Sequence, residues 1–348
     1  MSVRDDASQT DVRMDDDPRL RPEREAVVGS AGRRRGPGRG ERLMVPRAEF
    51  RSYYGLPVLN EPPWKAQDIA GYLFLGGLAG ASSTLAAAAE LTGRPHLARA
   101  GKVGAVCALG GSLYALIHDL GRPERFVNML RVFKVTSPMS VGTWILTVYG
   151  PQAGLAALTA VTGRFPRLGR IAALGAALTG PAVATYTAVL VSDTAVPVWH
   201  DAHRELPLLF AGSALASAGA LGLLAAPLDE TGPARRAVLA GVATEYAAAK
   251  LMERRLGPVV AEPLKRGRGG LLMRLGEALS LTGALLSQTA GRRGGGAAAL
   301  AGSAVLAGSI CVRFGVFQAG MASARDPKYT VEPQRARLDR AEREESRP

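Results

Sequence analysis

The chain has 348 residues, of which 47% are hydrophobic and 21% charged, and its formal net charge is +13. Its two cysteines, Cys107 and Cys311, are too few for a disulfide framework or for an iron–sulfur cluster. The arginines flank hydrophobic runs, and this pattern indicates membrane topology before it indicates nucleic-acid binding.

The N-terminal part of the chain has little that could build a core. Residues 1–45 alternate acidic and basic clusters with glycine and proline, which predicts a disordered tail. Residues 46–68 include Pro62 and Pro63, which disfavour a helix, and Trp64, a residue typical of the membrane interface. We therefore expect residues 46–68 to form an extended arm at the membrane surface.

Apolar runs rich in alanine, glycine and leucine follow the arm. A run of about 20 such residues matches the thickness of a bilayer core, and small residues let membrane helices approach closely. The runs cover residues 69–91, 98–117, 141–161, 168–191, 206–226, 234–249, 271–289 and 297–317. The second and the sixth are the weakest. The sequence predicts an all-α, polytopic protein of the cell membrane, with about eight transmembrane helices in two four-helix bundles over residues 69–320 and a C-terminal tail from 321 to 348.

An even number of spans places both termini on one side of the membrane. The connections expected on that side, residues 118–140, 192–205 and 250–270, are longer than those on the far side. Long connections more often carry function, so the terminus side is the expected working face. Basic residues mark both faces, and the sequence leaves open which face is cytoplasmic.

Several polar side chains interrupt the apolar runs. The alternating direction of the helices predicts that all of them lie in the terminus-side half of the membrane. They are Asp119, Tyr186, Glu245, Glu277 and Arg313. Because charges in a bilayer are costly, each is a pairing or a functional hypothesis.

Two interpretations remain open for each group of polar residues. Glu245, Glu277 and Arg313 either neutralise one another between helices or form a proton path. Tyr186 by itself is typical of a packed aromatic with a bonded hydroxyl. Asp119 either ends a helix and pairs with Arg122, or it exchanges protons at a membrane pocket.

The histidines argue against a haem subunit. A cytochrome b type subunit needs histidines inside facing helices to ligate its haem. The four histidines of this chain lie in loops or at helix ends, at positions 96, 118, 200 and 203. We therefore expect no haem, no iron–sulfur cluster and no metal site in this chain.

One long segment carries a resemblance to a known family. Residues 118–131, HDLGRPERFVNMLR, followed by residues 136–144, TSPMSVGTW, resemble the signature of the NrfD/PsrC family of polysulfide reductase membrane subunits. Residues 72–80, the segment from Tyr186 to Trp199, and residues 313–330 are also similar to the family. The resemblance covers roughly residues 50 to 335.

The resemblance implies a haem-free, quinone-reactive subunit with eight helices. Its partners would be a four-cluster ferredoxin-like iron–sulfur subunit and a molybdopterin catalytic subunit, and its bound substrate would be menaquinone or ubiquinone. The family's tyrosine and aspartate at the quinone carry over to Tyr186 and Asp119. The resemblance further implies a polar contact to the quinone from residues just before the first helix, for which the candidates are Lys65, Gln67 and Asp68. His118 and Arg122, on either side of Asp119, are the other candidates for the pocket. The arm that begins at Tyr53 looks most like subunits associated with formate dehydrogenases.

Two other functions stay open at this point. The first is a proton or solute transporter in which Glu245, Glu277 and Arg313 form the path. The second is a structural anchor that only holds a soluble enzyme at the membrane. Quinone chemistry needs two electrons and two protons, and a buried phenol and carboxylate suit that chemistry.

Overall fold

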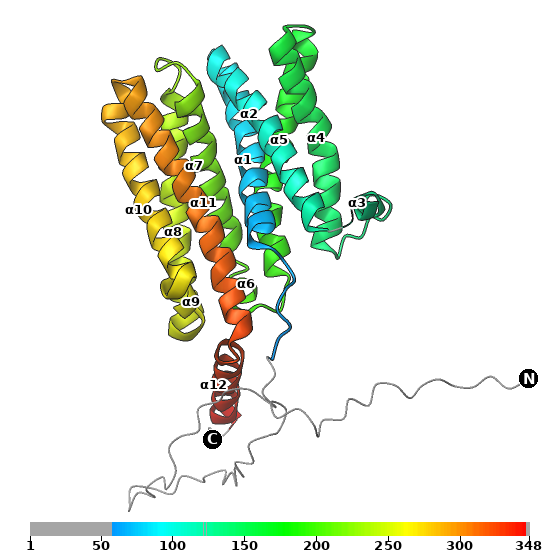
Figure 1. Ribbon diagram of the computed structural model, residues 1–348, viewed down its shortest axis with the longest axis vertical. Coiled ribbons are helices and arrows are strands. Elements are labelled where there is room, and N and C mark those ends of the chain that lie inside the picture. The colour runs from blue at the N-terminus through cyan, green and yellow to red at the C-terminus, as the bar shows by residue number, and fades with distance from the viewer. Residues whose placement is uncertain (1–57, 121, 123, 346–348) are drawn as a thin grey trace, which may run out of the picture. The chain divides into compact units, whose positions relative to one another are not determined.

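The computed structural model of the protein describes residues 58–120, 122 and 124–345 (Figure 1). These residues divide into two units. Residues 61–324 form the helical body, and residues 58–60 and 325–345 belong to the second unit. The predicted tail, 1–45, and most of the predicted arm lie outside the described residues. Residues 58–65 are not helical, and the first helix begins at Ala66, three residues before the predicted span.

Eight helices of 20 residues or more occur within the described part of the helical body. They are α1 (Ala66–Leu91), α2 (Pro95–Asp119), α4 (Pro138–Thr162), α5 (Pro166–Ser192), α7 (Leu206–Ala225), α8 (Gly232–Val260), α10 (Gly267–Gln288) and α11 (Gly295–Arg325). Shorter helical segments connect them, namely α3 (Glu124–Met129), α6 (Pro197–Asp201), α9 (Glu262–Lys265) and the 3-10 turn η2 (Ala290–Arg292). In the second unit, α12 (Lys328–Glu345) is a strongly charged helix.

The helix boundaries follow local chemistry. Proline lies in the first turn of α2, α4, α5 and α7, where its missing N–H has no partner to lose. The side chain of Ser137 accepts a hydrogen bond from the backbone N–H of Ser140 and caps α4. Gly163, with a φ of 69°, ends α4 in the left-handed conformation that glycine adopts without strain.

Six helices are long and apolar enough to cross a membrane. They are α1, α2, α4, α5, α7 and α11. The prediction of a polytopic, all-α membrane protein is thereby confirmed. The helices α8 and α10 have the length of a span, but their charged residues set them apart from the other six. The count of eight spans therefore stays a prediction.

The long helices pack as two groups of four (Figure 1). The helices α1, α2, α4 and α5 contact one another in the first bundle. In the second bundle α8 packs on α7 and α10, and α11 packs on α7 and α10. The seam between the bundles is made by α7 against α1 and α5.

Small residues bring the helices close. Gly212 of α7 faces Gly241 and Glu245 of α8, and a Cβ on Gly212 would lie 2.5 Å from the backbone nitrogen of Glu245. Such contacts are the means by which membrane helices associate when water exclusion does not drive them together.

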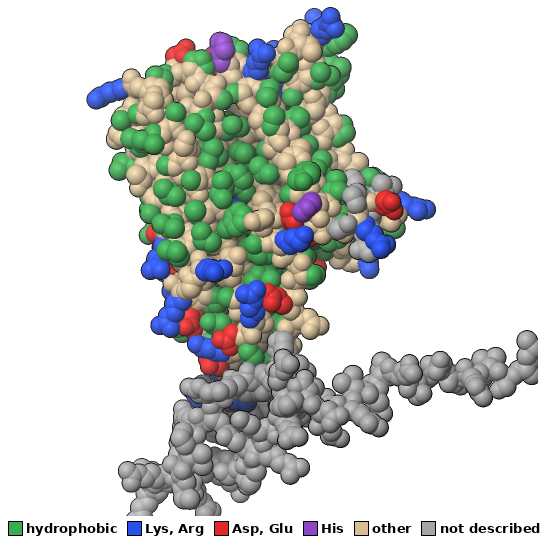
Figure 2. Space-filling model, in the orientation of Figure 1, with side chains coloured by type: hydrophobic (Ala, Val, Ile, Leu, Met, Phe, Trp, Pro, Cys, Tyr) green, Lys and Arg blue, Asp and Glu red, His purple; other side chains and the backbone are tan. Residues whose placement is uncertain are grey.

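The outer surface of the helical body is apolar. Large hydrophobic side chains such as Leu178, Ile171 and Leu285 point outward, with 83%, 67% and 66% of their surface exposed. Figure 2 shows hydrophobic side chains over the middle of the visible face, with charged side chains gathered towards the ends. A belt of this kind fits a surface that contacts lipid.

Candidate functional site

Two tyrosines meet inside the first bundle. The hydroxyl of Tyr72 in α1 is hydrogen-bonded to the hydroxyl of Tyr186 in α5. Their rings form an edge-to-face pair with centroids 6.5 Å apart, and both side chains are buried. The ring of Tyr186 lies so close to Gly142 of α4 that a side chain at position 142 would collide with it. Three helices therefore fix the position of the Tyr186 phenol.

A cluster of titratable side chains lies where α1 begins and α2 ends. The imidazole Nδ1 of His118 lies 2.9 Å from Oδ2 of Asp68. The backbone N–H of Lys65 donates to Oδ1 of Asp119 over 3.3 Å. The ring of Tyr114 stacks on His118 with centroids 5.9 Å apart. Asp68 is four residues before Tyr72, so the two side chains lie on one face of α1.

The predicted site residues fall into two layers along α1. Asp119 bonds to Lys65 at the helix start, and Tyr186 bonds to Tyr72 seven residues later, which is about 10 Å along a helix. The carboxylate of Asp119 and the phenol of Tyr186 are thus not in direct contact. Gln67 is exposed.

Arg122 is also exposed, and its neighbours in the chain, residues 121 and 123, lie outside the described residues. Within the described part of the chain no ion pair joins Arg122 to Asp119. The interpretation in which Arg122 neutralises Asp119 at the end of a helix therefore gains no support from the structure.

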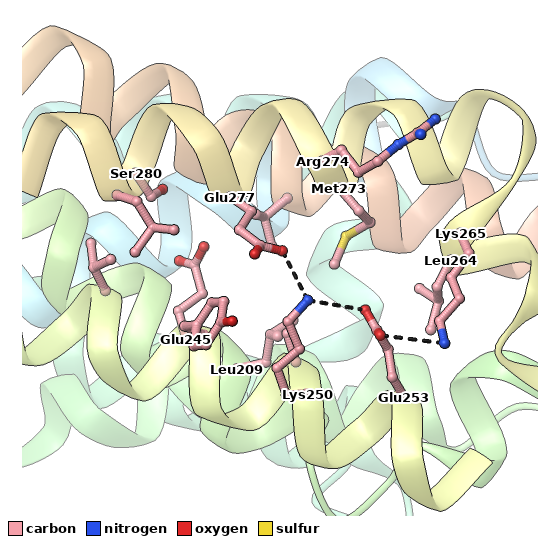
Figure 3. A pocket seen from close by; sticks show the side chains of 15 residues that line it. Leu209, Glu245, Lys250, Glu253, Leu264, Lys265, Met273, Arg274, Glu277 and Ser280 are labelled. Atoms are coloured by element: carbon pink, nitrogen blue, oxygen red, sulfur yellow. Dashed lines mark hydrogen bonds and ion pairs between the residues drawn. The ribbon is translucent and has the colours of Figure 1, made fainter. Parts of the chain in front are cut away.

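Charged residues gather around a cavity of about 350 Å³ in the second bundle (Figure 3). The lining includes Glu245 and Glu277, the two predicted carboxylates, from α8 and α10 respectively. Lys250 lies between them and Glu253, with its Nζ 3.1 Å from Glu277 and 3.8 Å from Glu253. Lys265 of α9 lies 3.5 Å from Glu253 at the end of this row.

Arg313, the third member of the predicted group, lies elsewhere. Its side chain is 1% exposed, and its Nη2 donates to the carbonyl oxygen of Phe210 over 2.8 Å. The guanidinium also lies over the ring of Phe210, 3.6 Å from the centroid. Glu245 and Arg313 attract each other electrostatically, but Arg313 is not among the residues that line the cavity.

Sequence reasoning missed three residues of these sites. Tyr72 falls within a segment similar to the family, and its spacing of four from Asp68 is a usable signal. Lys250 and Glu253 fall in an expected connection because the apolar run stops at residue 249. In the structure α8 continues past both residues to a kink at Gly257, which places both side chains on the cavity wall.

Comparison with known families decides what kind of protein this is. Residues 59–241, more than half of the chain, match the family described as polysulphide reductase, NrfD. The chain belongs to the NrfD family. No curated protein is recognisably similar to it. NrfD proteins are membrane subunits of molybdoenzyme complexes, and the six apolar helices fit a multi-pass location in the membrane.

The NrfD match has a boundary that separates the two sites. It includes all of the first bundle, with Tyr72, Tyr186 and Asp119, and it ends at residue 241 in α8. The cavity residues from Glu245 onward lie beyond the matched segment. The tyrosine pair therefore lies inside the segment that matches the family, and the charged residues of the cavity lie outside it.

Proposed function

We propose that this NrfD protein is the haem-free, quinone-reactive membrane subunit of a molybdopterin and iron–sulfur oxidoreductase complex. The observation that carries the proposal is the hydrogen bond between the buried phenols of Tyr72 and Tyr186, inside the segment that matches the family. Buried polar groups are costly unless they are bonded, and each phenol here is the partner of the other, so the pair can accept a polar substrate that replaces one of the two partners.

The tyrosine pair has the chemistry that a quinone requires. A quinone carbonyl is a hydrogen-bond acceptor, and a phenol is a donor. Because the two hydroxyls bond each other, a carbonyl oxygen that enters the site takes the place of one phenol as partner of the other. Tyr186, held against α4 at Gly142, is the fixed partner in this exchange.

The cluster at the start of α1 supplies the second requirement, a route for protons. Reduction of a quinone takes up two electrons and two protons, and oxidation of a quinol releases them. The carboxylates of Asp68 and Asp119 and the imidazole of His118 are groups that exchange protons, and all three are partly open at the terminus-side end of the bundle. Asp119 and Tyr186 are the residues to which we assign the reaction.

The electrons have to come from or go to partner subunits. With two cysteines and its histidines outside the helix centres, this chain offers no ligand set for a cluster or a haem. We assign electron exchange to a four-cluster ferredoxin-like subunit at the terminus-side face. A molybdopterin subunit, for which formate is the proposed substrate, carries the soluble chemistry. Menaquinone and ubiquinone both suit the site.

Two substitutions test this assignment in the purified complex. Asp119→Asn and Tyr186→Phe should each abolish quinone-linked turnover, while assembly and the dye-linked activity of the soluble partner survive. Unchanged quinone-linked turnover in both variants would contradict the proposal. Loss of both activities together would show an assembly defect, and size-exclusion chromatography of the complex identifies that case.

A purely structural anchor is the competing function. It predicts that the isolated complex binds no quinone analogue with useful affinity. Isothermal titration of the detergent-solubilised complex with a quinone-site inhibitor separates the two functions. Tight binding that is lost in Tyr186→Phe argues against the structural anchor.

A further inference from the structure

The cavity of the second bundle is unlike the apolar packing around it. It has a volume of about 350 Å³ and lies between α8 and α10, with contributions from α7, α9 and α11. Its lining combines apolar side chains such as Leu209, Met273 and Val312 with six charged residues. Charged side chains in a membrane bundle normally face a water-filled space or one another, and here they line a cavity and pair with one another.

The charges follow one another from the mouth of the cavity inward (Figure 3). Lys265, half exposed on α9, marks the terminus-side end and pairs with Glu253. Glu253 pairs with Lys250, and Lys250 pairs with Glu277. Because the signs alternate, the row adds no net charge to the bundle while it keeps a polar surface along one wall.

The inner end of the cavity holds polar atoms without partners. Glu245 is 5% exposed and Ser280 is 2% exposed, and both side chains line the cavity. Among the described residues, neither Oε2 of Glu245 nor the hydroxyl of Ser280 has a hydrogen-bond partner. An unpartnered carboxylate oxygen in this position needs a donor from outside the chain. At about 30 Å³ per water molecule, the cavity has room for several.

The charged and titratable groups that face Glu245 come from three helices. Lys250 lies one turn further along α8, Glu277 faces it from α10, and Arg313 attracts it from α11. The packed face of α7 contributes the buried hydroxyl of Ser213, which lies close enough to Glu245 to interact with its carboxylate. The positive charge that acts on Glu245 is that of Arg313, and a proton on the Glu245 carboxylate removes the attraction between the two.

The far half of the second bundle is closed to water. Beyond Val242 the interior consists mainly of small apolar side chains from α7, α8, α10 and α11. This apolar plug includes Ala216, Ala220, Ala234, Val238, Ala284, Ala301 and Val305. Two buried hydroxyls also lie in this half, on Ser217 and Ser287, and each donates to a backbone carbonyl oxygen of its own helix. A path for ions through the whole bundle is therefore not formed in this conformation.

We propose that the cavity is a water-filled proton-access pocket that opens only at the terminus-side end of the second bundle, with Glu245 as the proton-binding group at its closed end. In the binding step a hydronium ion at the inner end gives its proton to a carboxylate oxygen of Glu245 and leaves a water molecule. The reverse step restores the carboxylate. This site is separate from the proposed quinone site and does not depend on it.

Cysteine labelling of the intact complex in proteoliposomes tests the one-sided opening. In a variant without Cys107 and Cys311, a single cysteine replaces Ala249 on the cavity wall, and a membrane-impermeant cationic thiol reagent is added to one side at a time. We expect Ala249→Cys to react from one side only. Lys265→Cys at the mouth should react from the same side, and Leu285→Cys on the apolar outer surface should not react.

Labelling of Ala249→Cys from both sides would overturn the one-sided pocket, because the apolar plug would then admit water. Absence of labelling at Ala249→Cys, with Lys265→Cys labelled, would overturn the water-filled pocket itself. Either result is independent of quinone-linked turnover.

Infrared difference spectroscopy of the complex tests the proton-binding group. A pH step should change the carbonyl stretching band of a neutral carboxyl group. That band should disappear in Glu245→Gln and remain in Glu253→Gln, because the Glu253 carboxylate of the wild type is paired with Lys250 and Lys265 and does not give rise to it. Quinone-linked turnover should be unchanged in Glu245→Gln, which distinguishes failure of this inference from failure of the proposed function. A pH-dependent band that persists in Glu245→Gln would overturn the assignment.

Discussion

The phenol of Tyr72 in α1 and the phenol of Tyr186 in α5 share a hydrogen bond across 114 positions of sequence. Both side chains are buried in the bundle that the NrfD family match covers. The contact depends on Gly142, since any larger residue there would push Tyr186 out of its place. Tyr72 thus orients the hydroxyl of Tyr186, which we propose binds the quinone.

Removal of the Tyr72 hydroxyl should slow quinone-linked turnover without unfolding the protein. In Tyr72→Phe the Tyr186 hydroxyl loses its partner, and a lost hydrogen bond of this kind costs about 1 kcal/mol, or roughly a fivefold change in rate. Because Tyr72 positions Tyr186, we expect the pH profile of turnover to shift as well. Steady-state kinetics of the complex over a range of pH values measure both effects.

Tyr149→Phe is the matched control for this variant. The Tyr149 hydroxyl is also buried, and it bonds Ser83 Oγ over 2.8 Å and the carbonyl oxygen of Ala79 over 2.7 Å. Its loss should lower thermal stability by about 1–3 kcal/mol and leave the turnover of the folded complex unchanged. If both tyrosine variants lower turnover equally, Tyr72 has only a structural role.

Replacement of Gly212 by a larger residue should push α7 and α8 apart. In Gly212→Leu the new side chain would meet the backbone of α8 at Gly241 and Glu245, so the two helices have to separate. Overpacking of a core costs about 1–3 kcal/mol, and helix association in a membrane is sensitive to it. We expect a reduced yield of monodisperse protein in fluorescence-detected size-exclusion chromatography.

Gly110→Leu provides the comparison. Gly110 of α2 is exposed, and a Cβ there would meet nothing within 4 Å. This variant should be obtained at the wild-type level. A normal yield of Gly212→Leu would contradict the packing of α7 on α8 described above.

Stability should depend on pH through Glu230, in the connection between α7 and α8. Partial burial favours the neutral form, but hydrogen bonds from the Leu97 amide and from His96 outweigh it and hold the pKa of Glu230 below its ordinary value of 4.5. A carboxyl group whose pKa is lowered in the folded state contributes its full stabilisation when the pH is above its ordinary pKa. That contribution is lost as the pH falls through the lowered value.

Thermal unfolding in detergent between pH 7 and pH 3 measures this contribution. The melting temperature of the wild type should fall towards acid, and part of that fall should be absent in Glu230→Gln, which starts from a lower value at pH 7. The neighbouring Asp229 is exposed, and Asp229→Asn should follow the wild-type curve. If the melting temperatures of the wild type and Glu230→Gln fall in parallel as the pH is lowered, the hydrogen bonds between Glu230 and the start of α2 do not contribute to the pH dependence.

The helices could be predicted from sequence because their signal is local. Apolar runs of bilayer length predicted the start of each long helix to within four residues, since a membrane helix is set by its own composition. The end of α8 could not be found this way. Its last 11 residues contain four charged side chains, among them Lys250 and Glu253, which end the apolar run although the helix continues past both and has the cavity beside it.

The candidate site was predictable in part for the same reason. Asp68, His118 and Asp119 follow from helix ends and from the resemblance, and the structure brings these three together where α1 begins and α2 ends. The hydrogen-bond partner of Tyr186 was not predictable. Several side chains could have reached its hydroxyl, and which of them does so depends on how α1 and α5 cross. The same holds for Arg313, which faces Phe210 at the seam and not Glu277.

The ratio of quinone-linked to dye-linked turnover in Tyr186→Phe is the most direct test of the central claim. Both activities are measured on one preparation of the reconstituted complex, so that assembly cancels from the ratio. Because a positioned proton donor contributes about a hundredfold or more to such a reaction, we expect the ratio to fall by at least about two orders of magnitude. A ratio equal to that of the wild type would contradict the assignment of the quinone to the Tyr72 and Tyr186 pair.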